Sequence, residues 1–296
     1  MTILLFGAGG QVGSALQRSL AFHGPATHHD RTDTDLRDPA AIEAAVATTA
    51  PSVIVNAAAY TSVDAAESDP DSAAAVNRDA VATMAAEAAR IGALLIHYST
   101  DYVFSGRGET PSTPDDPPDP QNVYGATKRA GEQAILASGC EALIFRTSWV
   151  YSAHGNNFVK TMLRLGQARD ALRVVDDQIG APTAADLIAD VTSVALHAYR
   201  HGQLPGGLYH LSAAGATSWH GFATHILERA RRNGVALAVD PDRIEPIPTT
   251  AFPTPAPRPA NSRLSNARLE TALGIHMPDW RVHASQVVDQ LSRPIG

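Results

Sequence analysis

The sequence of 296 residues contains a single cysteine, Cys140, so it cannot form an intrachain disulfide. No apolar run approaches the length of a membrane span. The apolar start at residues 2–6 runs straight into glycines, without the basic and hydrophobic regions of a signal peptide. These absences favour a cytoplasmic protein and exclude a disulfide-stapled secreted domain.

Positive charge is also scarce. The formal net charge is -7, and lysine occurs only at positions 128 and 160. An acidic chain of this kind is a poor partner for nucleic acid or for an anionic membrane. A single pocket can still be positive, so a phosphate-bearing small molecule remains compatible with this composition.

The first half of the chain alternates short apolar runs with helical patterns. Continuous apolar strands separated by helices predict a parallel sheet covered on both faces, and right-handed crossovers then make it doubly wound. We therefore expect an α/β fold with a dinucleotide-binding Rossmann domain over residues 1–150. The strands are expected at residues 2–6, 26–29, 53–55, 94–98 and 142–146, and the helices at residues 11–21, 40–50, 72–91 and 124–137.

The alternation becomes irregular after about residue 150. Helical patterns near residues 157–168, 184–200 and 218–233 predict a smaller, mainly helical C-terminal substrate lobe over residues 151–296, some segments of which return to the first domain. Two proline-rich stretches, residues 109–121 and 246–259, are interpreted as loops that border the active site.

A glycine loop follows the first expected strand and opens the first helix. Its spacing is G-x-x-G-x-x-G on Gly7, Gly10 and Gly13. Such glycines allow a tight turn, a close approach of backbone to a pyrophosphate, and close packing of helix on strand, while the helix N-terminus offers free N–H groups. The position of the loop, between a strand and a helix, predicts a dinucleotide site.

The second strand ends at Asp30 and Arg31. An acidic residue about 20 positions past the glycines usually binds the ribose hydroxyls of NAD, whereas an arginine can bind the 2′-phosphate of NADP. Both types are present, so the pattern leaves NADH and NADPH open, with NADPH slightly favoured. Asp35 and Leu36 would flank the adenine, and the small residues at 56–59 would let the cofactor lie over the strand ends.

Tyr124 and Lys128 lie four positions apart in an expected helix, on one face. A tyrosine with an ordinary pKa near 10 is a weak acid–base catalyst, and a nearby ammonium group brings it towards the working range. Thr100 ends the fourth expected strand, where its hydroxyl can bind a substrate carbonyl and the tyrosine oxygen. The three residues predict proton transfer coupled to hydride transfer.

At this point the chain resembles a known family, the dTDP-4-dehydrorhamnose reductases, which are extended short-chain dehydrogenases/reductases. The resemblance covers nearly the whole chain. The matching stretches include LLFGAGGQVG (4–13), VNAAAYTSVD (55–64), HYSTDYVF (97–104), NVYGATK (122–128), FRTSWVY (145–151), GNNFVKTMLRL (155–165), DQIGAPT (177–183), GLYHL (207–211) and the proline-rich residues 252–264.

The resemblance implies reduction of the C4 ketone of dTDP-4-dehydro-L-rhamnose by NAD(P)H. The product would be dTDP-L-rhamnose, a precursor for polysaccharides such as O-antigen. Tyr124 would donate the proton, Lys128 would tune it and Thr100 would orient the oxygen. Cofactor contacts are implied for Gly10, Gln11, Val12, Asp35, Leu36, Ala59, Tyr60 and Thr61, and sugar-nucleotide contacts for Thr100, Asp101, Trp149, Asn156 and Arg258.

A metal site is not predicted from the residues, and Mg²⁺ enters only through the resemblance. Some relatives dimerise around a metal bound by acidic side chains, one of them just after the glycine loop, where this chain has Ala15. A homodimer is thus a possible assembly, and a metal-bridged one is disfavoured.

Two other functions stay open on the sequence. A redox-neutral epimerase or dehydratase could share this fold, but a dehydratase would carry Glu where this chain has Tyr102. A non-catalytic regulatory subunit could share it too, although the intact set of Thr100, Tyr124 and Lys128 argues against that reading.

Overall fold

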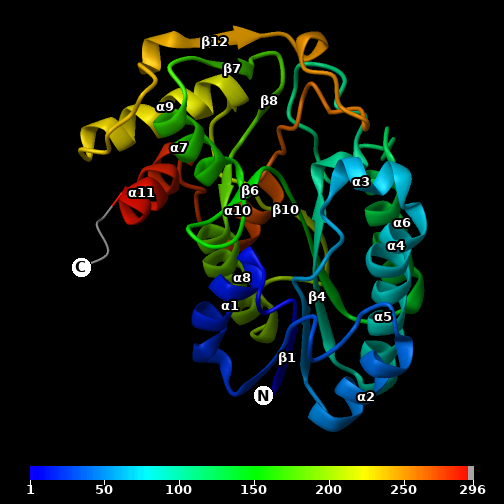
Figure 1. The fold of residues 1–296 in the computed structure, drawn as a ribbon. Coiled ribbons are helices and arrows are strands. Elements are labelled where there is room, and N and C mark those ends of the chain that lie inside the picture. The colour runs from blue at the N-terminus through cyan, green and yellow to red at the C-terminus, as the bar shows by residue number, and fades with distance from the viewer. Residues whose placement is uncertain (293–296) are drawn as a thin grey trace.

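The computed structural model describes residues 1–292, and at its centre lies a parallel sheet of six strands (Figure 1). The strand order is β10-β5-β4-β3-β1-β2, and every neighbouring pair is parallel. The strands are β1 (Ile3–Phe6), β2 (Ala26–His29), β3 (Val53–Asn56), β4 (Leu94–Thr100), β5 (Ala142–Thr147) and β10 (Gly207–His210).

Helices cover both faces of this sheet, because alternate side chains of each strand point to opposite sides. Ile3 and Leu5 belong to one buried cluster, whereas Leu4 and Phe6 belong to another. Against the first face pack α1 (Gln11–Leu20) and α8 (Ala185–Arg200); against the second pack α2 (Pro39–Thr49), α5 (Ala80–Ile91) and α6 (Val123–Ser138). The predicted doubly wound α/β fold is confirmed.

The strand order reverses between β1 and β3. Chain connections leave this point in opposite directions, so a crevice opens beyond the carboxyl ends of the two strands. The glycine loop follows β1 and the alanine-rich segment follows β3. The topology therefore brings the two sequence features that predicted a cofactor to one place.

One expected helix is interrupted. The sequence pattern predicted a single helix over residues 72–91, but the structure has α3 (Val63–Ser68), α4 (Pro70–Ala74), a π-helical turn at Ala75–Asp79 and then α5. A π-turn widens the helix by one residue and redirects the side chains around it. Here the redirected residue is Asn77, whose side chain is buried.

The part of the chain beyond residue 150 contains more strand than the sequence predicted. Its helices are α7 (Phe158–Ala168), α9 (Trp219–Arg232), α10 (Ala267–Leu273) and α11 (Trp280–Ser292). Three two-stranded sheets join β6 (Val150–Tyr151) with β9 (Thr183–Ala184), β7 (Leu172–Val175) with β12 (Ile244–Ile247), and β8 (Ile179–Gly180) with β11 (Thr217–Ser218). Short 3₁₀ turns lie at Ala21–His23, Asp101–Val103, Pro241–Arg243 and Thr249–Ala251.

These small strands were not predicted from the sequence, because segments of two to four residues are too short to show a clear alternation of apolar and polar residues. Strand β12 even contains Pro246, which an edge strand tolerates because its unpaired side needs no N–H donor. The stretch at 246–259, expected as a loop, therefore begins inside a strand.

The chain does not divide cleanly at residue 150. Strand β10 lies in the second half of the sequence but pairs with β5 in the central sheet, and α8 packs on α1. The division into residues 1–150 and 151–296 stays a proposal, and residues 293–296 lie outside the described part.

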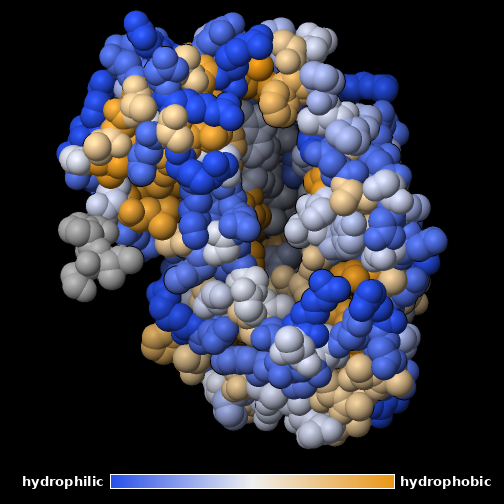
Figure 2. All heavy atoms as spheres, viewed as in Figure 1, coloured by the Kyte–Doolittle hydropathy of each residue, from blue (hydrophilic) through white to orange (hydrophobic). Residues whose placement is uncertain are grey.

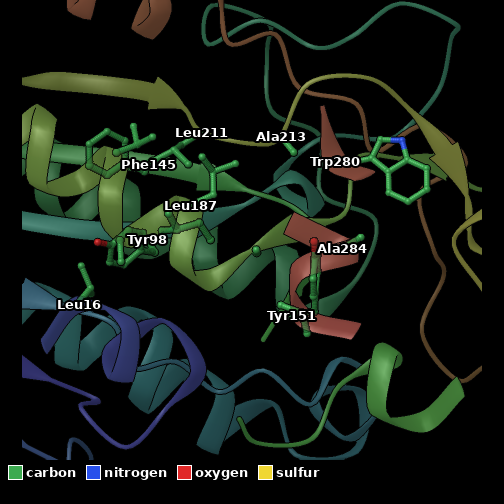
Figure 3. Close-up of a cluster of buried hydrophobic side chains, with 14 of the residues drawn as sticks. Leu16, Tyr98, Phe145, Tyr151, Leu187, Leu211, Ala213, Trp280 and Ala284 are labelled. Atoms are coloured by element: carbon green, nitrogen blue, oxygen red, sulfur yellow. The ribbon is translucent and has the colours of Figure 1, made fainter. Parts of the chain in front are cut away.

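A large apolar cluster connects the sheet to the small second part. It runs from Leu16 and Tyr98 on the sheet side, through Tyr151, to Trp280 of α11 (Figure 3). This shared core means that the second part is packed directly on the first. Among residues 1–292, no helix is both long and apolar enough to cross a membrane.

Candidate active site

A cleft of about 1060 Å³ opens at the carboxyl ends of β1, β3 and β4. Figure 2 shows the molecule hollowed between the side that carries α3 and α4 and the side that carries α7 and α9. Its lining includes nearly all the residues singled out from the sequence: Gly7, Gly10, Gln11, Val12, Asp30, Arg31, Asp35, Leu36, Ala59, Tyr60, Thr61, Thr100, Asp101, Tyr124, Lys128, Trp149 and Asn156.

The glycine loop leaves no room for a side chain. Gly7 has a φ of 78°, and a Cβ there would lie 2.6 Å from the Ala58 nitrogen. Gly13 lies outside the cleft lining, and a Cβ on it would lie 2.0 Å from the Gly7 carbonyl oxygen. Gly7 therefore allows β1 to approach β3, and Gly13 allows helix α1 to approach the loop.

The N-terminus of α1 faces the cleft through Gln11 and Val12. The residue that precedes the helix, Gly10, provides no side-chain cap, and the first turn has no acidic residue. The first N–H groups are thus free for an external acceptor, and the helix dipole favours an anion there. A bare glycine cradle at a helix N-terminus fits the pyrophosphate of a dinucleotide.

At the far end of the cleft lies a cluster of charged residues after β2. The Asp30 carboxylate accepts hydrogen bonds from the Thr32 backbone and hydroxyl, both at 2.7 Å. Arg37, which the sequence reading missed, also lines the cleft. It donates to both carboxylate oxygens of Asp35, at 2.6–3.2 Å, and these hydrogen bonds hold the pKa of Asp35 well below its ordinary value.

The loop after β3 is anchored by the π-turn. The side chain of Asn77 accepts a hydrogen bond from the Tyr60 backbone nitrogen at 2.9 Å and donates one to the Tyr60 backbone carbonyl oxygen at 3.1 Å. It also donates to the Thr127 hydroxyl of α6 at 3.2 Å. The segment Ala59–Thr61, predicted to contact the cofactor, is thereby tied to the helix that carries Tyr124. No sequence signal pointed to Asn77.

Thr100 and Tyr124 meet at the centre of the cleft. Thr100 is buried at the end of β4, and Tyr124 lies in the first turn of α6. Burial raises the pKa of the Tyr124 phenol to about 12, although a hydrogen bond with Thr100 acts in the opposite direction. The phenol is therefore protonated at neutral pH, the state needed for a proton donor.

Helix α6 begins where it does because of Asn122. Its side-chain oxygen accepts from the Gly125 nitrogen at 2.8 Å, and its amide donates to the Pro257 oxygen at 2.9 Å. The first proline-rich stretch also contacts the segment that follows the second one, because the Ser112 backbone nitrogen donates to the Arg263 carbonyl oxygen at 2.9 Å. The start of the Tyr124 helix is thus held by a loop more than a hundred residues away.

Lys128 lies deeper than Tyr124 and is fully buried. Its Nζ donates to the Tyr98 carbonyl oxygen at 2.6 Å and lies 3.4 Å from Nε2 of His97. Burial lowers the pKa of Lys128 to about 8, against the opposing effect of Glu132. The ammonium group is held by β4 rather than by the phenol, so any effect on Tyr124 acts across the site.

The other side of the cleft carries Asp101, Trp149 and Asn156. Asp101 accepts from the Thr100 hydroxyl at 3.1 Å, and burial raises its pKa to about 6. Tyr102, at the position of a dehydratase glutamate, packs edge-on against Tyr124 with ring centroids 5.5 Å apart. Tyr102 thus packs against the Tyr124 ring, but it does not supply the carboxylic acid that a dehydratase would carry at this position.

Arg258 is placed differently from the other candidates. It does not line the cleft; its guanidinium donates to the Asp64 carboxylate at 2.7 Å instead. Asp64 also accepts from the Ala256 nitrogen at 3.2 Å, so the pair joins α3 to the second proline-rich stretch. A nucleotide contact by Arg258 would require exchange of this ion pair.

No group of three or more His, Cys, Asp or Glu side chains in residues 1–292 is arranged to hold a metal ion. Ala15 packs against the apolar core. The acidic side chains nearby, Asp186 and Asp190, lie 3.6 and 3.1 Å from the Arg18 guanidinium. The single Arg18 guanidinium thus offsets part of their negative charge.

The parallel sheet, the glycine cradle and the Thr100, Tyr124 and Lys128 set together define an extended short-chain dehydrogenase/reductase with a nicotinamide cofactor. Comparison with known proteins narrows this class. The family model described as RmlD substrate binding domain matches residues 1–293, and the chain belongs to that family.

Individual relatives agree with this assignment. A dTDP-4-dehydrorhamnose reductase of Burkholderia thailandensis is 50% identical over 285 residues, covering 95% of this chain and 96% of the relative. The crystal structure of the corresponding enzyme from Clostridium acetobutylicum superposes with a TM-score of 0.90 at 35% identity, covering 99% and 100% of the two chains. That of Bacillus anthracis, in complex with NADP, has a TM-score of 0.88 at 34% identity, covering 98% and 99%.

Proposed function

We propose that this chain reduces the C4 ketone of dTDP-4-dehydro-L-rhamnose with a nicotinamide hydride and so forms dTDP-L-rhamnose. The observation that carries the proposal is the convergence of Thr100, Tyr124 and Lys128 on the cleft that begins at the glycine cradle. Burial raises the pKa of the Tyr124 phenol to about 12, so the phenol keeps its proton at neutral pH. Reductases that act on this sugar nucleotide match the chain over nearly its full length.

In this mechanism the cofactor supplies the hydride, and the chain supplies position and the proton. Thr100 and Tyr124 hydrogen-bond the ketone oxygen, which concentrates positive dipoles where negative charge develops. Tyr124 then transfers its proton to the forming alkoxide. Lys128 contributes a buried positive charge that favours the phenolate left behind.

The adenosine end of the cleft favours NADPH over NADH in this proposal. Asp30 accepts hydrogen bonds from its own turn, and the charge of Asp35 is balanced by Arg37. Arg31 and Arg37 both line the cleft, and a guanidinium group can form two parallel hydrogen bonds with a phosphate. A 2′-phosphate would therefore meet two guanidinium groups at this end.

Substrate binding is assigned to Thr100, Asp101, Trp149 and Asn156, with Arg258 as a nucleotide contact once it leaves Asp64. The homodimer considered from the resemblance stays a prediction, and Mg²⁺ stays an implication of the resemblance alone.

The test is a stoichiometric one. Purified protein is incubated with dTDP-4-dehydro-L-rhamnose and a limiting amount of NADPH, and the product is identified by mass spectrometry and NMR. We expect one equivalent of NADPH consumed per dTDP-L-rhamnose formed, and reaction to stop when NADPH is exhausted. Conversion with only catalytic cofactor and no net change in absorbance would assign the chain to the redox-neutral epimerases or dehydratases instead.

A further inference from the structure

Trp149, between β5 and β6, has a backbone that is rare for a bulky residue. Its φ is 48°, in the left-handed region, and among residues 1–292 only Ala50 shares a positive φ without being glycine. Such a conformation is strained and persists only where the surroundings hold it. Because Trp149 also lines the cleft, the residues that hold this conformation also set the position of part of the cleft wall.

One face of the Trp149 indole is covered by Trp219, the first residue of α9. The two ring systems are 3.6 Å apart between centroids and inclined by 10°. This spacing is full face-to-face contact, so no other group can lie between them. Trp219 itself is oriented by a hydrogen bond from its Nε1 to the Gln178 side-chain oxygen at 3.1 Å and by the Phe158 ring at 4.7 Å.

The other face is covered by Gly180. A Cβ built on Gly180 would lie 2.5 Å from Cε2, 2.8 Å from Cζ2 and 2.9 Å from Nε1 of Trp149. The shortest distance goes to the central one of these three bonded atoms, so Gly180 lies above the ring plane rather than beside its edge. The gap to Trp219 has no room for it, and Gly180 must therefore occupy the opposite face.

The two covering residues are parts of one small unit. Gly180 lies in β8, which pairs with Thr217 and Ser218 of β11, directly before Trp219. Neither Gly180 nor Trp219 lines the cleft, whereas Trp149 does. The indole is thus contacted on both faces, by Trp219 on one and by Gly180 at Cε2, Cζ2 and Nε1 on the other, and residues outside the cleft lining set its position.

We propose that Trp219 and Gly180 are positioning residues that clamp the Trp149 indole, so that it forms a rigid part of the sugar-facing wall of the cleft. This inference rests on the proposed function, because the effect of the clamp is measured through the binding of a sugar nucleotide. The clamp fixes a surface that the sugar binds, so its loss should weaken sugar-nucleotide binding more than it slows the chemical step. It lies away from the glycine cradle, so cofactor binding is independent of it.

The test uses three variants in the full chain: Trp219→Leu, Trp219→Phe and Gly180→Ala. Leucine removes the flat support, and alanine pushes on the other face without backbone strain, because the φ of Gly180 is not in the left-handed region. We expect W219L and G180A each to lower kcat/KM for the sugar nucleotide about tenfold or more, mainly through KM, with NADPH affinity unchanged. W219F, which keeps a flat ring, should recover most of the loss seen for W219L.

A double-variant cycle shows whether the effect passes through Trp149. In a Trp149→Leu background, the added methyl of G180A has no indole to displace, so its further effect on KM should disappear. An unchanged KM for the sugar nucleotide in both W219L and G180A, with NADPH binding intact, would overturn the clamp while leaving the proposed function standing. Equal losses in NADPH and sugar-nucleotide binding would also overturn it, because they would show general damage to the fold. An inactive wild-type protein would instead refute the proposed function, and if G180A fails to fold, the W219L and W219F pair decides.

Discussion

The two walls of the cleft are built in different ways. The cofactor-facing wall consists of backbone and small side chains from the loops after β1 and β3, where a Cβ on Gly7 would overlap Ala58, and of charged side chains after β2 at its exposed end. The substrate-facing wall consists of the side chains of Thr100, Tyr124 and Trp149, which come from three separate segments. The first wall is sensitive to added atoms, whereas the second is sensitive to lost hydrogen bonds and lost packing.

The largest effect should come from the second wall. Replacing Tyr124 by Phe removes the proton donor but keeps the edge-on ring contact with Tyr102. We expect kcat to fall about 10²-fold or more, the usual scale for a positioned acid, with NADPH affinity nearly unchanged. Steady-state kinetics and a fluorescence titration of NADPH measure the two quantities, and near-normal turnover would remove Tyr124 from the mechanism.

On the first wall, one methyl group should be enough. Gly7→Ala places a Cβ 2.6 Å from backbone at a φ of 78°, so both overlap and strain oppose it. We expect NADPH affinity to fall by about tenfold or more, because the loop must move away from Ala58 and the pyrophosphate cradle moves with it. The matched control is Gly92→Ala, which has a similar φ of 68° but no neighbour within 4 Å. Equal NADPH affinities in the two variants would show that the close approach to Ala58 is unimportant.

The pH dependence distinguishes the two buried groups on the catalytic side. The pKa of Lys128 is lowered to about 8, so its ammonium form is lost as pH rises through that value. The pKa of Tyr124 is raised to about 12, so the phenol keeps its proton over the same range. If the ammonium is required, kcat/KM for reduction stays level below pH 8 and falls by about tenfold per pH unit above it.

Lys128→Arg provides the control for this profile, because a guanidinium does not titrate in this range. Its remaining activity should lose the break near pH 8. A break of the same size in K128R would assign the titration to another group.

The smallest effect is expected at the exposed end of the first wall. Arg31→Ala removes one guanidinium beside the expected 2′-phosphate, so KM for NADPH should rise by a few-fold to about tenfold, whereas KM for NADH stays nearly constant. Arg37→Ala should act in the same direction and additionally free the Asp35 carboxylate. Equal changes in KM for NADPH and for NADH would show that the two arginines do not bind the 2′-phosphate.

Sequence reading worked best where function depends on local order. The glycine motif at 7–13 and the pair Tyr124 and Lys128 each lie within a few consecutive residues. The helices that contain or follow them can be predicted from the periodicity of the sequence. Strands β1, β3, β4 and β5 were predicted within one or two residues, because a strand buried on both faces is mainly apolar. Strand β2 was predicted as well, although its residues, Ala26–His29, are half-buried or exposed. The strands of the second part were missed, because their pairing partners lie far away in the sequence.

By itself the sequence determined the doubly wound sheet, the glycine cradle and the residue types that carry the chemistry. Tertiary structure alone decided how those residues are held: Asn77 on the Tyr60 loop, Lys128 on the Tyr98 carbonyl, and Trp149 between Trp219 and Gly180. The physical reason is that local propensity and periodicity act over a few residues. Burial, hydrogen-bond geometry and ring stacking instead depend on which distant segments the fold brings together.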